Sequence, residues 1–406
     1  MPLVAESVAE LARVPATRAC LDWFRRERGW INEQHLKLCR IAAPTFFEQK
    51  RAEWMIEQFR SLGWDARLDR AGNVVASLPG RREHPSVALT AHLDTVLAPR
   101  TGGDIKVSGD GRFLGPGVSD NGAGLAALLA LAAAWTASPP CEDSPLTPVL
   151  IANVGEEGEG NLCGIRYLCR NGMSSRLRSF LVLDGPGTDR ITSRALASRR
   201  FEVVLSGPGG HSWSDYGTGN PVHALSRAVA LFSDTLSGDR IPAGGSPRYS
   251  YNFGLIQGGS SINSIPVEAR AKVDLRSESA DRLEEMAALL ASVVDTAVET
   301  ENLRATARVS GQLREIGSRP AGALPEQAPI LRCLQAVDAH LGVRAFLDCS
   351  STDANVPLSL GLPAVSIGAG GQGGGAHTPA EWFQPEGREL GLRRILLTLC
   401  LLLAGD

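Results

Sequence analysis

The sequence has no excess of charge of either sign. Its 41 Lys and Arg residues nearly balance its 44 Asp and Glu residues, which leaves a formal net charge of -3 at pH 7. Nucleic-acid binding depends on concentrated positive charge that neutralises phosphates. Nothing in this balance indicates a nucleic-acid partner or a strongly acidic one, and we expect neither.

Long apolar runs are also missing. The run from Ile395 to Ala404 is far shorter than the roughly 20 residues that cross a bilayer as a helix. The segment from Met1 to Arg18 mixes Glu and Arg with small apolar residues, so it lacks the basic start and apolar centre of a secretory signal. We therefore expect no membrane partner, and we predict that the run from Ile395 to Ala404 forms a buried C-terminal helix.

Paired cysteine motifs are absent as well. None of the eight cysteines belongs to a CxxC pair, and in a long chain without a signal they are typical of reduced thiols in the cytoplasm. Cys163 and Cys169 lack both zinc-ligand spacing and a nearby histidine, so we do not expect them to bind metal. The predicted location is cytoplasmic.

What the chain does contain is a series of continuous apolar segments separated by helical ones. A length of 406 residues favours two domains. Strands are predicted over residues 74–78, 87–91, 149–154 and 180–183, and helices over 122–135 and 329–340. Buried strands that alternate with helices predict an α/β domain whose mostly parallel sheet is flanked by helices on both faces.

The pattern changes near Arg199. Strands are predicted over residues 201–205, 249–256, 269–275 and 305–313, and helices over 221–236 and 281–300. This β-α-β-β-α-β order is typical of a small ferredoxin-like α+β unit. Because the buried α/β pattern resumes at Pro329, the unit is an insertion. We predict a main domain of residues 1–198 and 315–406 and an inserted lid domain of residues 199–314.

Carboxylates and histidines stand near predicted strand ends or in glycine-rich turns. They are His92, Asp94, Asp120, Glu156, Glu157, Asp184 and His377. In doubly wound sheets, ligands collect beyond the carboxyl ends of the strands, so these distant groups can converge. Gathered carboxylates repel one another, and divalent cations are the simplest way to stabilise them. Imidazole and carboxylate ligands suit zinc, cobalt or manganese better than calcium, so the sequence predicts a site for a pair of such ions.

Other polar segments have plainer interpretations. A Glu156-Glu157 pair would be a solvated acidic turn if no buried strand preceded it. The glycine-rich loop 368–375 has no Lys and opens no helix, so a phosphate site is not expected there. Four isolated histidines are expected to be surface residues and not ligands: His35, His84, His223 and His340.

Together the motifs resemble the M20 metallopeptidase family, and they occur in the family's order along nearly the whole chain. The resemblance rests on His92-Leu93-Asp94, the turn from Gly117 to Gly122, Glu156-Glu157, Asp184 and His377. The segment from Ser351 to Asn355, with His377, is most similar to the peptidase T branch. Relatives in this family include PepV-type dipeptidases, carboxypeptidase G, aminoacylase and the deacylases of acetylornithine and succinyl-diaminopimelate. The resemblance implies a phosphorylase/hydrolase-like catalytic domain with an inserted lid.

The resemblance also implies two divalent metal ions, with zinc expected and cobalt or manganese as alternatives. Asp120 would bridge the two ions. His92 and Asp184 would complete one site, and Glu157 and His377 the other. The turn at Asp120-Asn121 resembles one that the family makes with a cis peptide bond.

Further carboxylates take their expected roles from the same resemblance. Asp94 would accept a hydrogen bond from the His92 imidazole and orient it. Glu156 would be the general base, which takes a proton from a metal-bound water and delivers it to the leaving amine. Asp353 and Asn355 are expected to cap or orient the loop beside the site, without a catalytic step.

Three residues of the predicted lid match the family's substrate contacts. His211 would help to hold the tetrahedral oxyanion, often across a dimer, and Asn263 would contact the substrate. Arg276 would grip a substrate carboxylate with its planar guanidinium. Each also has a simpler alternative: a turn residue for His211, a turn former for Asn263, and an ion pair with Asp274 or Glu268 for Arg276.

The implied function is hydrolysis of amide bonds in small peptides, as by an aminopeptidase that acts on di- or tripeptides. In the family, Asp at position 184 tends to accompany aminopeptidases, and Glu tends to accompany carboxypeptidases and acyl-amino-acid hydrolases. An N-acyl-amino-acid deacylase or a carboxypeptidase needs the same metals and base and stays an alternative. A catalytically silent binding protein is a third interpretation, which the intact ligand set disfavours. Apolar faces on the two lid helices, and a lid sheet that could pair edge to edge with a partner, predict a homodimer that forms through the lid. The alternative is that these faces only cover the lid's own sheet.

Overall fold

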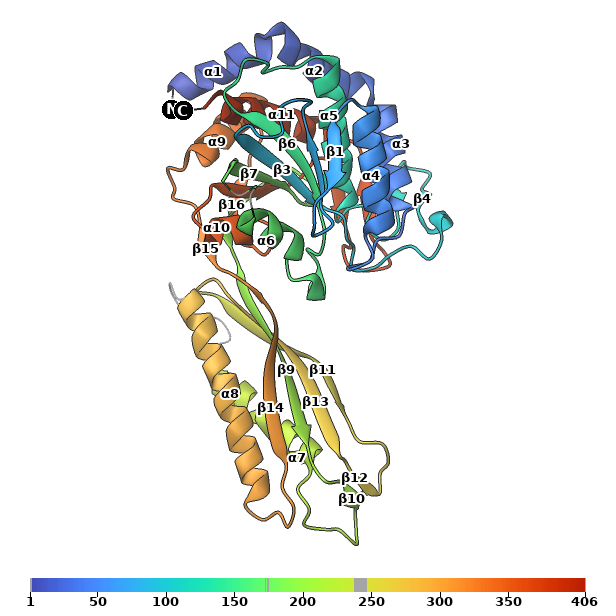
Figure 1. Cartoon of the computed structure of the whole chain (residues 1–406), viewed down its shortest axis with the longest axis vertical. Helices are drawn as coiled ribbons and strands as arrows, with labels where there is room; N and C mark the ends of the chain where they lie inside the picture. The colour runs from blue at the N-terminus through green and yellow to red at the C-terminus, as the bar shows by residue number, and fades with distance from the viewer. Residues whose placement is uncertain (1, 172, 174, 237–246, 406) are drawn as a thin grey trace. The chain divides into compact units, whose positions relative to one another are not determined.

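The computed structural model of the chain describes residues 2–171, 173, 175–236 and 247–405. The chain divides into two compact units, one of Met1–Ala195 with Gly322–Asp406 and the other of Leu196–Ala321 (Figure 1). The sequence predicts boundaries after residues 198 and 314. The structure divides the chain after residues 195 and 321 instead, so the second unit begins slightly earlier and ends slightly later than expected.

A large sheet with a parallel centre forms the first unit. Its strand order is β1-β2-β6-β3-β7-β17-β8-β15, and β16 also pairs with β8. The neighbours β6, β3, β7 and β17 run parallel, whereas β1, β2 and β15 are antiparallel to their neighbours. The strands are β1 (Asp65–Leu68), β2 (Val74–Ser77), β3 (Ser86–His92), β6 (Thr147–Asn153), β7 (Leu177–Leu183), β8 (Arg190–Ala195), β15 (Gly322–Ala323), β16 (Phe346–Ser350) and β17 (Ala364–Ile367).

Helices cover both faces of this sheet because its central strands carry apolar side chains on both sides. On β3, Leu89 packs into the cluster that contains α2, α3, α5 and α11, whereas Ala88 packs with α6 and α10 on the other face. The helices are α1 (Pro2–Arg13), α2 (Pro15–Arg26), α3 (Arg28–Cys39), α4 (Gln49–Ser61), α5 (Gly122–Ala137), α6 (Cys163–Arg170), α9 (Pro329–Leu341), α10 (Asn355–Ser359) and α11 (Arg388–Ala404). The predicted α/β class is confirmed.

The apolar run near the C-terminus lies within α11, whose residues from Ile395 to Cys400 are buried. This agrees with the buried helix predicted there. Across the part of the chain that the structure describes, no helix has the length and apolarity needed to span a bilayer.

A small antiparallel sheet connects two distant loops of the first unit. It has the order β18-β19-β5-β4, with β4 (Lys106–Val107), β5 (Phe113–Leu114), β18 (Gln372–Gly374) and β19 (Trp382–Gln384). Phe383 pairs with Phe113, so the loop that contains His377 is held beside the turn that contains Asp120. These strands are too short to show a hydrophobic period, and the sequence predicts none of them.

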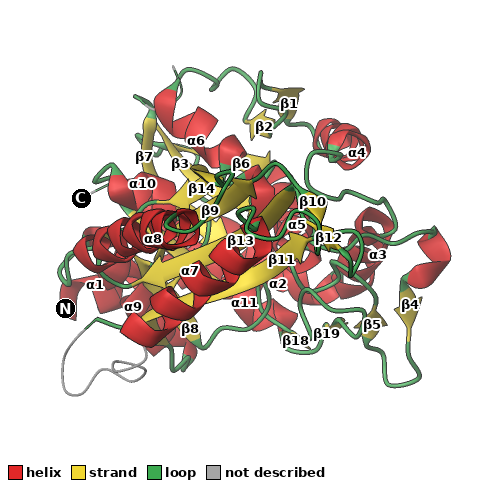
Figure 2. Cartoon of the chain, turned by 90° about the horizontal axis from the view of Figure 1, so that it is seen from below, coloured by secondary structure: helices red, strands yellow, loops and turns green. Residues whose placement is uncertain are grey.

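The second unit has the β-α-β-β-α-β order expected from the sequence. Its elements are β9 (Ala197–Ser206), α7 (Pro221–Leu236), β11 (Tyr249–Gly258), β13 (Glu268–Ser277), α8 (Ala280–Asn302) and β14 (Ser310–Arg319). The antiparallel sheet has the order β11-β13-β9-β14, and α7 and α8 lie side by side on one of its faces (Figure 2). Phe201, Val273 and Leu290 belong to the core between the sheet and the two helices. Two further short strands, β10 (Gly210–His211) and β12 (Ser264–Ile265), form a separate antiparallel pair in the same unit.

The closing strand of this unit differs from its prediction. Residues 305–309 form turns, and β14 extends past residue 314 to Arg319. β14 is an edge strand with mostly exposed or half-buried side chains, so its sequence lacks the apolar alternation that marks a strand. Cross-strand ion pairs support it instead, including Arg199 with Glu315 at 2.6 Å and Arg314 with Glu202.

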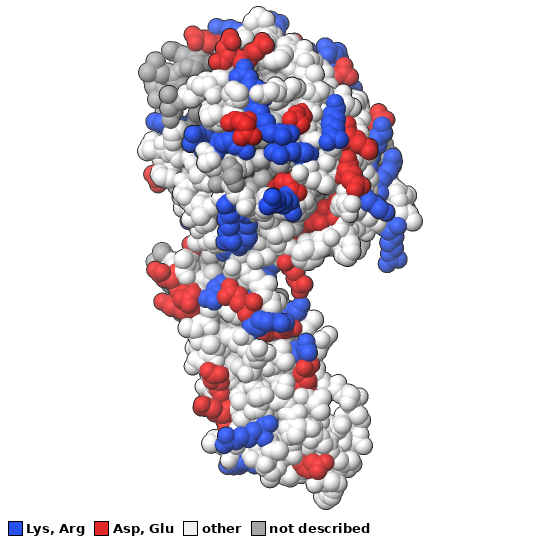
Figure 3. Space-filling view, viewed as in Figure 1, with Lys and Arg blue, Asp and Glu red and all other residues white. Residues whose placement is uncertain are grey.

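Charged side chains of both signs are interspersed on the face drawn in Figure 3. On that face neither Lys and Arg nor Asp and Glu gather into one large patch, in line with the small net charge.

Candidate metal centre

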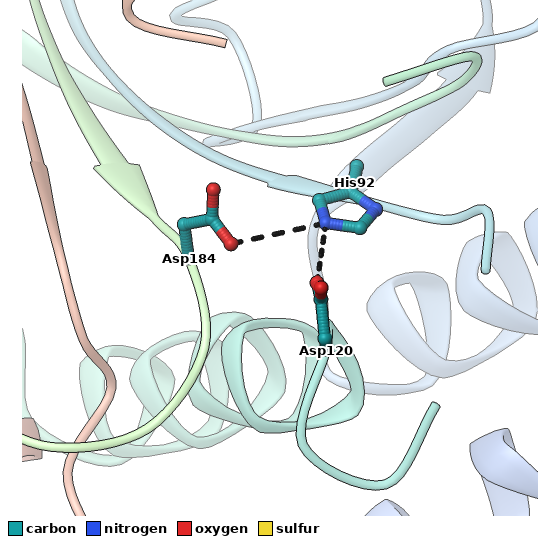
Figure 4. Close-up of side chains that lie close together, drawn as sticks. All are labelled: His92, Asp120 and Asp184. Carbon is teal, nitrogen blue, oxygen red and sulfur yellow. Dashed lines mark hydrogen bonds and ion pairs between the residues drawn. The ribbon is translucent and has the colours of Figure 1, made fainter. Parts of the chain in front are cut away.

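The candidate site lies at the carboxyl ends of three neighbouring parallel strands in the first unit. His92 is the last residue of β3, Asp184 follows β7, and Glu156 and Glu157 follow β6. Because parallel neighbours end at the same edge of a sheet, their terminal side chains converge there. Asp120 reaches the same point from the turn before α5 (Figure 4).

Asp120 lies at the centre of this arrangement. Its Oδ1 is 3.0 Å from Nε2 of His92, and its Oδ2 is 2.9 Å from Nε2 of His377. Asp184 Oδ1 is 3.9 Å from the same His92 nitrogen (Figure 4), and Glu157 Oε1 is 2.8 Å from the same His377 nitrogen. One carboxylate therefore links two groups of donors, one on each of its oxygens.

The donor atoms fit a pair of divalent cations. In each of the groups His92–Asp120–Asp184 and Asp120–Glu157–His377, the candidate ligand atoms lie within 4.8 Å of one another. A third group, His92–Glu156–Glu157, meets the same distance criterion. Imidazole nitrogens with carboxylate oxygens are ligands typical of zinc, cobalt and manganese. The structure thus brings together all five residues that the sequence proposes as metal ligands.

Crowded carboxylates perturb the proton affinities here. Burial, followed by the charge of Asp120, raises the pKa of Asp184 to about 7. Hydrogen bonds that the His377 ring donates to Asp120 and Glu157 raise the pKa of His377 to about 10. Burial opposes protonation of His92, but its bonds to Asp120 and Asp94 outweigh burial and raise the pKa. Such shifts mark an excess of negative charge, which divalent cations would also balance.

Asp94 is fully buried and holds the backbone beside the site. Its two oxygens accept the N–H groups of Glu156 at 3.0 Å and Glu157 at 2.9 Å. The imidazole Nδ1 of His92 is nearer to the backbone carbonyl of Asp94, at 2.9 Å, than to its carboxylate, at 3.5 Å. Both contacts orient the ring, and the carboxylate also positions the two glutamates.

Glu156 is buried, with only 5% of its surface exposed. Behind it lies Asp353, whose pKa is raised to about 7 by burial and by the charge of Glu156. Asp353 accepts a hydrogen bond from Asn153 at 2.7 Å, and the side chain of Asn355 accepts the N–H of Thr352 at 2.9 Å. These contacts agree with the expected positioning role of the loop around Asp353.

Glu381 is a residue that sequence reasoning missed. Its carboxylate accepts three backbone N–H groups of the turn that contains Asp120: Gly117 at 2.7 Å, Ser119 at 2.8 Å and Asp120 at 2.9 Å. It is 3% exposed and stands four positions after His377. One short segment therefore supplies His377 and holds Asp120. A lone glutamate whose partners lie more than 260 positions earlier gives no local signal.

Replacing Glu381 by Gln should weaken metal binding by about 10- to 100-fold, as loss of a group that orients a ligand does. Glutamine is isosteric, but its amide N–H would face one of the backbone N–H donors. Zinc competition against a chromophoric chelator would measure the loss, with Glu386→Gln, an exposed glutamate nearby, as the matched control. Unchanged zinc affinity in Glu381→Gln would contradict this role.

The turn at Asp120 contains a cis peptide bond between Asp120 and Asn121, as the family resemblance implies. Asn121 joins the turn to the end of β7: its Oδ1 accepts the N–H of Gly185 at 3.2 Å, and its Nδ2 donates to the carbonyl of Leu183 at 2.8 Å. The Asn121 side chain thus connects the segments that carry Asp120 and Asp184.

The three predicted lid residues fall into two places within the second unit. His211 pairs with Ser264, and Ser212 donates its N–H to the carbonyl of Asn263, so His211 and Asn263 lie together. Arg276 lies near the other end of β13 and forms an ion pair with Asp274 at 2.6 Å. The structure therefore brings two of these residues together and keeps Arg276 apart from them.

The prediction for the isolated histidines is wrong in one respect. His35 is fully buried, and not on the surface, because its ring nitrogens bond to the Val118 carbonyl at 2.8 Å and to the Arg388 guanidinium at 2.7 Å. His84, His223 and His340 are exposed as expected. Among the described residues, neither these four histidines nor Cys163 and Cys169 belong to a group that could hold a metal ion.

Comparisons with known proteins agree with this geometry. The family model described as Peptidase family M20/M25/M40 matches residues 88–399. YqjE of Bacillus subtilis, described as uncharacterized, is 24% identical over 359 residues, which cover 83% of this chain and 89% of that protein. A protein of Aspergillus terreus named "Probable carboxypeptidase" is 30% identical over 223 residues, 50% of this chain and 47% of its own.

Solved structures share the fold at low identity. A Staphylococcus aureus tripeptidase has a TM-score of 0.71 at 19% identity and covers 93% of this chain and 98% of its own. YxeP of Bacillus subtilis, described as a dinuclear metal binding peptidase, has a TM-score of 0.66 at 14% identity, with 94% and 100% covered. Since the family model spans most of the sequence, this chain belongs to peptidase family M20/M25/M40 and is a hydrolase of that family.

Proposed function

We propose that this protein is a dinuclear metallopeptidase that hydrolyses amide bonds of small peptides with a free amino terminus. The observation that carries the proposal is the Asp120 carboxylate, whose two oxygens face two histidines within two separate donor groups. The fold that the chain shares with a tripeptidase is consistent with a small-peptide substrate.

His92 and Asp184 would hold one cation, Glu157 and His377 the other, and Asp120 would contact both. Zinc is the expected metal, and cobalt or manganese would suit the same donors. Bound divalent cations supply Lewis acidity, which polarises the scissile carbonyl and makes water easier to deprotonate.

Glu156 would move the proton. Its carboxylate accepts a proton from the attacking water as the new C–O bond forms, and later delivers that proton to the departing amine nitrogen. Asp94 fixes the backbone of Glu156 through the 3.0 Å hydrogen bond, which keeps the base in place during both transfers. Burial of Glu156 limits its exchange of protons with bulk water.

The proposal extends to a homodimer. Arg276 lies eight positions along β13 from Glu268, about 25 Å at roughly 3.3 Å per residue, whereas His211 and Asn263 lie just beyond the Glu268 end. An extended tripeptide spans only about 10 Å, so the backbone positions of the two sets lie farther apart than such a substrate reaches, which favours their coming from two copies. A second copy would supply one of the sets, and a strictly monomeric mass in solution would exclude this arrangement. All eight cysteines are free, which fits the proposed cytoplasmic location.

Chelation provides the direct test. Dialysis against a chelator should abolish hydrolysis of unblocked di- and tripeptides, and added zinc or cobalt should restore it. Hydrolysis that survives complete metal removal would refute the proposal.

Matched substrates with free and N-acetylated amino termini would distinguish the proposed aminopeptidase from its closest alternative. Cleavage of the acetylated set alone would show an N-acyl-amino-acid deacylase or carboxypeptidase, a reading that the similarity to the Aspergillus protein keeps open. A purified protein with no affinity for zinc would point instead to a silent binding protein.

A further inference from the structure

Two consecutive phenylalanines stand unusually exposed beside the metal centre. Phe46 is 61% and Phe47 is 72% exposed, although large aromatic side chains normally bury most of their surface. Phe46 also has a φ angle of 75°, a left-handed backbone conformation that a bulky residue seldom adopts.

Both flanking residues are anchored to the catalytic segments. Before the pair, the Thr45 hydroxyl donates to Asp94 Oδ2 at 2.9 Å. After it, the buried Glu48 carboxylate accepts the N–H of Gly155, the residue before Glu156, at 3.1 Å. Each phenylalanine is thus one peptide unit, about 3.8 Å between Cα atoms, from a residue bonded to the site. The backbone that carries the two rings therefore runs along the rim of the site.

A second segment places further apolar surface at the same position. Val96 and Leu97, 44% and 37% exposed, follow directly from Asp94 and Thr95. Thr95 donates its N–H to the Ala43 carbonyl at 3.0 Å and forms a β-bridge with Pro44. The two segments therefore run side by side, and together they border the carboxylate that positions Glu156.

Folding alone does not account for this rim. Exposed aromatic side chains gain little from folding, and the positive φ of Phe46 costs free energy that a glycine would avoid. Of the described residues other than glycine, only Phe46, Asn161, Leu162 and His377 have positive φ. Backbone strain of this kind concentrates at functional sites, and Phe46 borders one.

We infer that Phe46 and Phe47, with Val96 and Leu97, form an apolar subsite that receives a large non-polar side chain of the substrate. The inference rests on the proposed function and narrows its substrate class to peptides with a residue such as Leu or Phe next to the scissile bond. The metal ligands are all polar, so they cannot distinguish such a side chain from glycine. An apolar rim can distinguish them, because even one methylene in a hydrophobic pocket changes kcat/KM by about 10- to 200-fold.

Two variants test the subsite. Phe46→Gly removes the ring while suiting the φ of 75°, so the fold should persist, and Phe47→Ala removes the second ring. Zinc-loaded protein would be assayed with the peptides Leu-Gly-Gly, Gly-Leu-Gly and Gly-Gly-Gly. The variants should lose about 10- to 100-fold in kcat/KM for a leucine peptide and less than about threefold for Gly-Gly-Gly. Leu360→Ala, which trims a 54% exposed side chain elsewhere in the same unit, should change neither.

A binding measurement can test the subsite even if the proposed peptidase activity is wrong. If the wild-type protein cleaves no peptide, calorimetry on the zinc-loaded protein would compare leucinamide with glycinamide. Preference for leucinamide that Phe46→Gly and Phe47→Ala abolish would support the subsite even then. Equal losses on all peptides, no preference in binding, or a change of oligomeric mass without a change of selectivity would each overturn it, the last by showing that these side chains contact a second copy.

Discussion

Asp120→Asn is expected to remove both metal ions from the protein. The substitution keeps the shape of the side chain but withdraws the negative charge, which one oxygen presents to His92 and the other to His377. Loss of a residue that merely orients a ligand costs about 10- to 100-fold in affinity, so loss of a ligand shared by two sites should exceed that for both ions. Peptidase activity should fall by roughly three orders of magnitude or more, because without the ions Glu156 has no activated water to deprotonate and the scissile carbonyl is not polarised.

Metal content after exhaustive dialysis, with calorimetric titration of zinc, would measure this effect. Asp143→Asn makes the same chemical change at an exposed position of the same unit and should retain the wild-type stoichiometry. The histidines offer a second readout, since the hydrogen bonds that Asp120 accepts from them raise the pKa of both. In the metal-free variant, NMR titration should show both pKa values lowered. An Asp120→Asn protein that still binds two zinc ions at wild-type affinity would rule out the bridging role.

The strands that carry this site could be predicted because they are buried on both faces. The run predicted over residues 87–91 corresponds to β3 (Ser86–His92), and all of its side chains are buried. A strand covered on both sides carries almost no charge, so its end is visible in the sequence as the first histidine or carboxylate. His92, Glu156 and Asp184 stand at such ends, and for that reason the sequence places them together.

The supporting contacts could not be predicted because they depend on backbone groups far away in the chain. Glu381 bonds to N–H groups of residues 117–120, and any residue type at those positions could donate them. The burial of His35 is unpredictable for a related reason: its partners are a backbone carbonyl and Arg388, 353 positions away. A polar side chain that is satisfied at long range looks like a surface residue when only its neighbours in sequence are known.

The division between the units shows the same limit. The strand β14 is held by cross-strand ion pairs such as Arg199–Glu315, and its exposed side chains leave no apolar period to follow. The sequence allows Arg276 to be a substrate ligand or part of a simple ion pair, and in the structure it bonds to Asp274. Ion pairs join specific residues in space but produce no periodic pattern in the sequence. Edge strands held by ion pairs are therefore harder to predict than the apolar strands at the centre of a sheet.

Glu156→Gln is expected to separate catalysis from metal binding. If Glu156 is the general base, the amide can neither accept the proton of the attacking water nor return it to the amine, and kcat should fall by about 10²- to 10⁴-fold. Zinc content should stay at the wild-type value because the donor groups that share Asp120 remain intact. Glu159→Gln, at an exposed position of the same loop, should leave both quantities unchanged.

The measurement also decides between two readings of the geometry. Glu156 belongs to a third donor group, with His92 and Glu157, whose atoms are as close together as those of the other two groups. If Glu156 were a ligand, Glu156→Gln would lose zinc and activity in parallel, and saturating zinc would partly restore turnover. If Glu156 is the base, Glu156→Gln should keep full zinc occupancy and have a lowered kcat that added metal does not restore. Its pH–rate profile should also lose the acidic limb. Turnover at the wild-type rate would exclude both readings, because neither a base nor a ligand could lose its charge without an effect on turnover.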